Sequence, residues 1–166
     1  MTLNDLPLGA SVYIDANIFV YHFTGISIEC REMLERVERK EIHAETGAHI
    51  LLEVLHRLMT IEAISKGLIT SGQPAKKLKQ RPGVIGQLSD YNTCVREIRR
   101  LGVKVRPLTL RHIRKSEAIR NSYNLMTNDS VTAAMMLSRQ ITNIASFDSD
   151  LSRVPGLTLF QPTDVV

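Results

Sequence analysis

The sequence has no tryptophan, only two cysteines and no long apolar run. Cys30 and Cys94 lie far apart and match no metal-ligand spacing, so we expect two buried thiols rather than a disulfide framework or a zinc site. The apolar runs are far shorter than the roughly eighteen residues that span a bilayer, and the start, MTLNDLPLGA, resembles no signal segment. These absences predict a soluble cytoplasmic protein without a membrane partner.

Two further absences limit the kinds of metal and phosphate site that the chain can form. The five histidines make no HExxH or other paired ligand spacing, and the chain has no glycine-rich phosphate loop. We therefore expect the histidines to be ordinary core or surface residues. Any metal site has to use oxygen ligands.

The composition fits one domain of 166 residues, 43% of them apolar, with a formal charge of +4 and a pI near 9.3. Such a charge favours a polyanionic partner but is modest. The basic residues gather at 76–81, 96–100 and 111–115, and each cluster taken alone is most simply a solvated helix face. The stretch 65–87, rich in Gly, Pro and Lys, is interpreted as a helical excursion from the domain of residues 1–166.

Short β-branched runs alternate with longer helical patterns. This alternation predicts a parallel sheet covered by helices on both faces, a three-layer α/β/α fold. Ser27 and Thr46 are expected to open the first two helices, and Gly67 and Gly102 to close the second and third. The predicted strands are 11–14, 42–45, 103–108, 142–146 and 157–160, and the predicted helices are 28–39, 48–65, 85–101, 109–121 and 128–139.

Carboxylates follow two of the predicted strands. Asp15 interrupts the run VYIDANIFVYHF directly after the first strand, and Asp148 follows the fourth strand in NIASFDSD. In an open α/β sheet, ligands bind outside the carboxyl ends of the strands, where the strand order reverses. If the first and fourth strands are neighbours, these two carboxylates converge at such a point.

Two helical acids are candidates for the same site. Glu53 lies beside the apolar face of the second helix, although it could simply pair with Arg57 four residues later. Asp129 lies in a first helical turn, where an acid is also favoured by capping and by the helix dipole. Four acids from separate segments indicate a shared site more strongly than any one acid does alone.

Clustered carboxylates repel one another and are pushed toward protonation unless a cation is bound. Their oxygens suit Mg²⁺ or Mn²⁺, which can activate a water and stabilise a leaving phosphate oxygen. The reaction that this pattern predicts is metal-dependent hydrolysis of a phosphodiester. The basic clusters would attract a nucleic-acid backbone that the acids alone would repel.

The same motifs resemble PIN-domain ribonucleases, and among them the VapC-type toxins of toxin–antitoxin pairs. The resemblance rests on YIDANIFVY, LLEVLHRL, NDSVTAAM and SFDSDLSRVPGLTLF, and covers nearly the whole chain. It implies a sheet of order 3-2-1-4-5, an RNA substrate and a small antitoxin. It also suggests a homodimer, to which the apolar residues Leu68, Ile69, Val84 and Ile85 of the excursion would contribute.

The resemblance also assigns roles to residues. Catalysis would fall to Asp15, Glu53, Asp129 and Asp148. Of these acids, the three aspartates would hold Mg²⁺ or Mn²⁺. Asn17 would hold the site together by hydrogen bonds, and Ser146 would lie beside the metal-bound water. We assign Asp150 a supporting place, because it comes two residues after Asp148, where it could cap the turn that follows or touch the metal only through water.

Two other interpretations stay open at this stage. Asp15 could be the covalent nucleophile of a haloacid-dehalogenase-type phosphatase, but that chemistry needs a second aspartate where the chain has Asn17, which transfers no proton. The chain could also be a PIN-like module that binds RNA or a partner without cutting. A metal-dependent RNA cleavage assay separates binding from cleavage.

Overall fold

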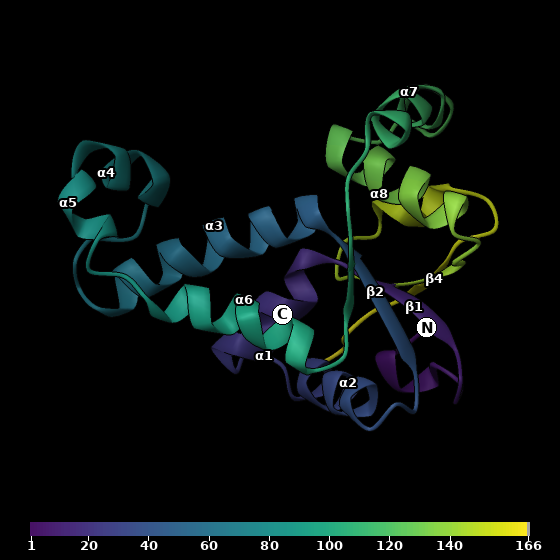
Figure 1. The fold of residues 1–166 in the computed structure, drawn as a ribbon, viewed down its shortest axis with the longest axis horizontal. Helices are drawn as coiled ribbons and strands as arrows, with labels where there is room; N and C mark the ends of the chain where they lie inside the picture. Colours follow the sequence, from purple (N-terminus) through teal and green to yellow (C-terminus); the bar gives the residue numbers. More distant parts are fainter. Residues whose placement is uncertain (166) are drawn as a thin grey trace.

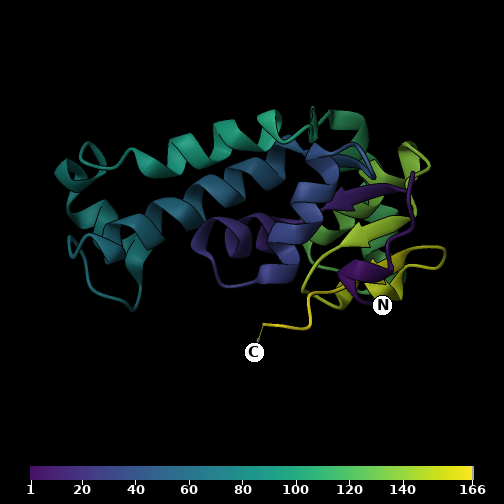
Figure 2. The ribbon, with the colours of Figure 1, turned by 90° about the horizontal axis from the view of Figure 1, so that it is seen from below.

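The computed structural model describes residues 1–165, and a parallel five-stranded sheet forms its centre (Figures 1 and 2). Val166, the last residue of the predicted domain, lies outside the described residues. The strand order β3-β2-β1-β4-β5 confirms the predicted order. The strands are β1 (Ser11–Ile14), β2 (His43–Gly47), β3 (Lys104–Arg106), β4 (Asn143–Ala145) and β5 (Thr158–Phe160).

Strand β1 lies at the middle of the sheet, paired with β2 on one side and β4 on the other. Val12, Tyr13 and Ile14 are completely buried. A parallel strand that is covered on both faces is expected to be almost uniformly apolar, as this one is. The two acids that end β1 and β4 therefore leave the sheet side by side.

Helices cover both faces of the sheet, which confirms the three-layer architecture. Helices α1 and α2 lie on one side, and α7 and α8, which pack against each other, lie on the other (Figure 1). The helices are α1 (Ala16–Thr24), α2 (Ile28–Glu38), α3 (Ala48–Ser65), α4 (Pro74–Gln80), α5 (Pro82–Ile85), α6 (Asp90–Arg100), α7 (Leu110–Tyr123) and α8 (Thr127–Ser138).

Helix α1 was not predicted from the sequence. Its residues, ANIFVYHFT, are β-branched and aromatic, which favours a strand locally. The first five residues of the helix are buried, so tertiary packing overrides this preference. Gly25, with a φ of +72°, ends the helix in the left-handed conformation that glycine adopts most easily.

Two predicted helix starts are wrong. Thr46 does not cap α3, because its hydroxyl donates a hydrogen bond to the Ile14 carbonyl at 2.8 Å. Gly47 takes the cap position instead, and a Cβ there would lie 2.5 Å from the His49 ring and from the Tyr13 hydroxyl. The third helix begins at Asp90 rather than at residue 85, because α5 and a turn occupy the segment before it.

The end of α3, α4, α5 and the start of α6 form a helical arm that projects away from the sheet (Figure 1). A second small core holds the arm together, formed by Ala63, Ile69, Leu78, Val84 and Leu88. Of the four apolar residues suggested above for dimer contact, Ile69 and Val84 are thus buried inside the arm. Both cysteines are free, as predicted, although only Cys30 is fully buried. Each helix of the described chain is too short or too polar to cross a membrane.

Candidate active site

The ends of β1 and β4 carry a hydrogen-bonded group of polar side chains around Asp15. The Asp15 amide donates to the Ala145 carbonyl at 3.0 Å, which continues the pairing of the two strands by one step. One oxygen of the Asp15 carboxylate, Oδ2, accepts hydrogen bonds from Asn17 Nδ2 and from Ser146 Oγ, each at 2.7 Å. The carboxylate therefore has a fixed orientation.

Asn17 and Ser146 also hold the β4 end of the site. The Asn17 Oδ1 accepts the backbone N–H of Phe147 at 2.9 Å, and the Ser146 Oγ accepts that of Asp148 at 3.0 Å. Ser146 is fully buried and Asn17 is 9% exposed. Because both side chains bridge the two strand ends, they set the position of Asp148 relative to Asp15.

Asp148 and Asp150 have different contacts. The Asp148 Oδ1 accepts the backbone N–H of Asp150 at 2.9 Å. The Asp150 Oδ1 instead accepts a hydrogen bond from Arg153 at 2.7 Å. The suggestion that Asp150 caps the following turn is therefore wrong. Asp148 accepts the backbone N–H of Asp150, and the Asp150 side chain forms an ion pair with Arg153.

Glu53 reaches the site from α3 and Asp129 from the first turn of α8. The Glu53 carboxylate lies 3.7 Å from Arg57, so the helical ion pair considered from the sequence exists. Burial and the charge of Asp15 nevertheless raise the pKa of Glu53, and Arg57 and a hydrogen bond from Asn128 only partly offset this. The sequence contained no signal that Asn128 would contact Glu53, because the contact joins two helices.

Electrostatic effects show that the acids share one site. Burial raises the pKa of Asp129 to about 6, assisted by the charges of Asp148, Asp15, Asp150 and Glu53. Burial also raises the pKa of Asp15, against the effect of the Ser146 hydrogen bond. The four acids predicted from separate segments, together with Asp150, are therefore brought together at the carboxyl edge of the sheet.

The donor set fits a hard divalent cation, since it consists of carboxylates whose charges repel one another and have few cations nearby. A cation here would relieve the repulsion that raises their pKa. The described residues contain no group of three or more acidic, His or Cys side chains already arranged around one point as metal ligands. Binding a cation would thus require the carboxylates to close around it.

The sequence model of the PIN domain family matches residues 12–157, so the chain belongs to the PIN domain family. One relative is the protein named ribonuclease VapC2 of Methanocaldococcus jannaschii. It is 27% identical over 150 residues, which cover 90% of this chain and 93% of the relative.

Three solved structures share the fold. One is VapBC2 from Rickettsia felis, described as bound to a DNA fragment from its promoter, with a TM-score of 0.60, 13% identity and coverage of 91% of this chain and 98% of the other. A toxin–antitoxin complex from Klebsiella pneumoniae has a TM-score of 0.53, 16% identity and coverage of 89% and 95%. Mycobacterium tuberculosis VapC20, described as a toxin that cleaves the sarcin–ricin loop, has a TM-score of 0.55, 16% identity and coverage of 85% and 92%.

Proposed function

We propose that this protein is a metal-dependent endoribonuclease of the VapC type and the toxin of a toxin–antitoxin pair. The observation that carries the proposal is the gathering of Asp15, Glu53, Asp129 and Asp148 at one sheet edge, where burial and neighbouring acids raise the pKa of Asp15, Glu53 and Asp129. Membership of the PIN domain family and the ribonuclease name of the archaeal relative support it. The proposal treats residues 1–166 as one nuclease domain with a helical excursion at 65–87.

In this proposal Asp15, Asp129 and Asp148 hold Mg²⁺ or Mn²⁺, which when bound supplies an activated water and positive charge at the scissile phosphate. Asn17 and Ser146 orient the Asp15 carboxylate by their hydrogen bonds. Glu53, whose pKa is raised by burial, would accept a proton from the attacking water. Asp150 supports the site from outside through its pairing with Arg153.

The test is cleavage of single-stranded and structured RNA by the purified protein with Mg²⁺, with Mn²⁺ and with EDTA. We expect cleavage with either cation, none in EDTA, and a loss of about a hundredfold or more in Asp15→Asn. Glu32→Gln, an exposed acid on α2, is the matched control and should cleave normally. Undiminished cleavage in EDTA would contradict the metal mechanism, and binding without any cleavage would favour the non-catalytic module.

The phosphatase interpretation has little support in the site. Asn17 occupies the place of the required second acid, and its amide both donates to Asp15 and accepts from the Phe147 backbone. An amide held in this way supplies no proton. Hydrolysis of small phosphate esters by the purified protein, at a rate matching RNA cleavage, would reverse this judgement.

The partners remain part of the proposal. Two structural neighbours are described as a VapBC pair and as a toxin–antitoxin complex, which supports a small antitoxin here. The homodimer and the cytoplasmic location are predictions from the sequence and the resemblance. Light scattering at micromolar concentration tests the dimer, and a monomer would contradict it. Coexpression with the product of a small neighbouring gene tests for the antitoxin, which should copurify and suppress cleavage.

A further inference from the structure

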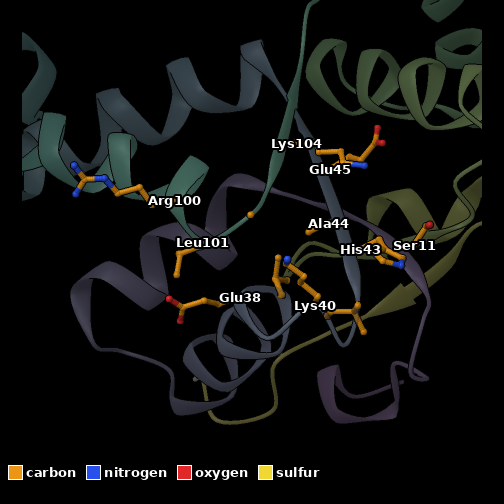
Figure 3. Close-up of a pocket in the computed structure, with 12 residues that line it drawn as sticks. Ser11, Glu38, Lys40, His43, Ala44, Glu45, Arg100, Leu101 and Lys104 are labelled. Carbon is orange, nitrogen blue, oxygen red and sulfur yellow. The ribbon is translucent and has the colours of Figure 1, made fainter.

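Three hollows lie along β3, a strand at one edge of the sheet, from its beginning to its end. The first, of about 500 Å³, lies between the end of α2, the start of β2 and the end of α6 (Figure 3). The second lies between α3, α6 and β3 and shares Gly102 and Lys104 with the first. The third, of about 460 Å³, lies between α7 and α8 and shares Arg106 with the second. Because neighbouring hollows share lining residues, we refer to the three together as the β3 groove.

The β3 groove is strongly basic. Its three hollows are lined by eight Lys and Arg side chains and only two Glu side chains, an excess of six that exceeds the +4 of the whole chain. Five of the eight cations have no carboxylate within 4.0 Å in the described part of the chain. They are Lys40, Arg99, Lys104, Arg111 and Lys115. The eight cations together come from five different segments.

A buried ion-pair cluster fixes two more cations of the groove. Glu45 is 8% exposed, and its carboxylate accepts hydrogen bonds from both Arg106 and Arg139. Burial alone would raise the pKa of Glu45, but the two guanidinium groups lower it to about 2, so it is ionised at neutral pH. One carboxylate neutralises only one of the two arginines. The cluster therefore keeps a net positive charge in a fixed position.

The basic cluster at 76–81 differs from the groove. Lys77 donates hydrogen bonds to the Thr70 and Ser71 carbonyls, and Arg81 donates to the Leu68 carbonyl. These two cations stabilise a loop of the helical arm. Of the three basic clusters in the sequence, only those at 96–100 and 111–115 contribute to the groove, so a shared function is restricted to them.

Protection of an edge strand explains only part of this arrangement. A free strand edge can pair with another chain, and a lysine on the strand, such as Lys104, discourages this. Arg99, Arg111 and Lys115 lie on helices and cannot serve that purpose. Their place along one groove suits a ligand with several negative charges in a row.

We propose that the β3 groove binds the sugar-phosphate backbone of RNA beyond the point of cleavage. The proposal rests on the proposed ribonuclease function. Arg106, which lines the second and third hollows, ends β3 and pairs with Gly47 at the carboxyl edge of the sheet, the edge that carries the acids. An RNA chain in the groove would therefore lead toward the acidic edge of the sheet.

The test measures RNA binding by the full chain in EDTA, with fluorescence anisotropy, between about 50 and 200 mM salt. The variant is Lys104→Gln with Lys115→Gln. The control is Lys76→Gln with Lys79→Gln, which removes the same charge from exposed positions of the arm. Each lost phosphate contact makes the slope of log affinity against log salt shallower by about 0.7 for single strands. We therefore expect the slope of the groove variant to be shallower by about 1.4 and the slope of the control to be unchanged.

Equal slopes in the groove variant and the control would overturn the proposal. So would a groove variant that binds RNA normally but no longer binds polyglutamate, since this would assign the groove to an acidic polypeptide. In cleavage assays, the groove variant should raise KM for a long RNA without changing kcat, and leave a short oligonucleotide unaffected. If the unaltered protein binds RNA but never cuts it, the ribonuclease proposal fails while the salt slopes still decide the groove.

Discussion

Carboxylates in two regions of this protein have opposite environments. At the carboxyl edge of the sheet, burial and neighbouring acids raise the pKa of Asp129 to about 6. In the helical arm, burial would also raise the pKa of Glu62, but hydrogen bonds from Lys66 and from the backbone N–H groups of Tyr91 and Ser89 lower it to about 2. Glu62 joins the start of α6 to α3, whereas the acids at the sheet edge repel one another.

The contrast separates structural from functional acids. A carboxylate whose oxygens already accept hydrogen bonds from cations and N–H groups stabilises the fold and has no free oxygen to bind a ligand. Acids that are gathered without such partners cost stability, and are retained where a site needs them. The following predictions test this contrast by replacing acids in both regions.

The largest effect is expected at the sheet edge. Asp148→Asn should lower RNA cleavage by about a hundredfold, the scale of losing a ligand or its support. Asp150→Asn should cost clearly less, because Asp150 pairs with Arg153 rather than lying at the strand end. Cleavage rates and melting temperatures of both variants decide the question. Equal losses would mean that the two aspartates act as a pair, and a larger loss in Asp150→Asn would assign the main role to Asp150.

In the arm, Glu62→Ala should lower the free energy of unfolding by about 1–3 kcal/mol, because two partly buried hydrogen bonds from backbone N–H groups and the bond from Lys66 lose their acceptor. The melting temperature should fall by about 2–4 °C for each kcal/mol in a chain of this size. Asp90→Asn is the matched control, since it removes only the exposed partner of Lys66 at 3.1 Å and should change little. Equal losses in both variants would show that the buried contacts of Glu62 contribute nothing.

The pH dependence of the unfolding free energy is a second test of the structural role of Glu62. The pKa of Glu62 is about 2 in the folded protein and 4.5 ordinarily. Its contribution to stability is therefore complete above about pH 4.5 and is lost as the pH falls toward 2. In urea titrations at several pH values, the gap in unfolding free energy between the unaltered protein and Glu62→Gln should be widest near pH 6 and narrow below pH 4.5. A gap that stays constant down to pH 3 would contradict the assignment.

The smallest effect should have the opposite sign. Without divalent cations, Asp129→Asn should raise the free energy of unfolding by about 0.5 kcal/mol, the scale of a partly exposed charge interaction, because it removes repulsion from the other acids. Added Mg²⁺ should stabilise the unaltered protein more than this variant, since binding to the folded state alone raises stability. Thermal melts with and without Mg²⁺ measure both effects. Destabilisation of Asp129→Asn in EDTA would show that Asp129 has a structural role.

Much of the fold could be predicted because it depends on local patterns. Apolar strands alternating with amphipathic helices indicated the parallel sheet, and four of the predicted helices lie within about two residues of observed ones. Helix α1 was missed since its β-branched residues favour a strand locally, and only burial on several sides makes the segment helical. The predicted start at residue 85 was wrong because α5 and a turn separate the arm's tip from α6.

The candidate site, like the fold, could be predicted from the sequence only in part. The sequence alone determined which acids end the strands, because Asp15 and Asp148 interrupt apolar runs that have no other reason to carry a charge. The strand order that brings them together was expected from the resemblance to the PIN family, and the structure has this order. Only the tertiary structure decided that Asp148 accepts the N–H of Asp150, that Asn128 contacts Glu53, and that cations from five segments meet along β3. Contacts between distant segments depend on packing in three dimensions, which no local pattern encodes.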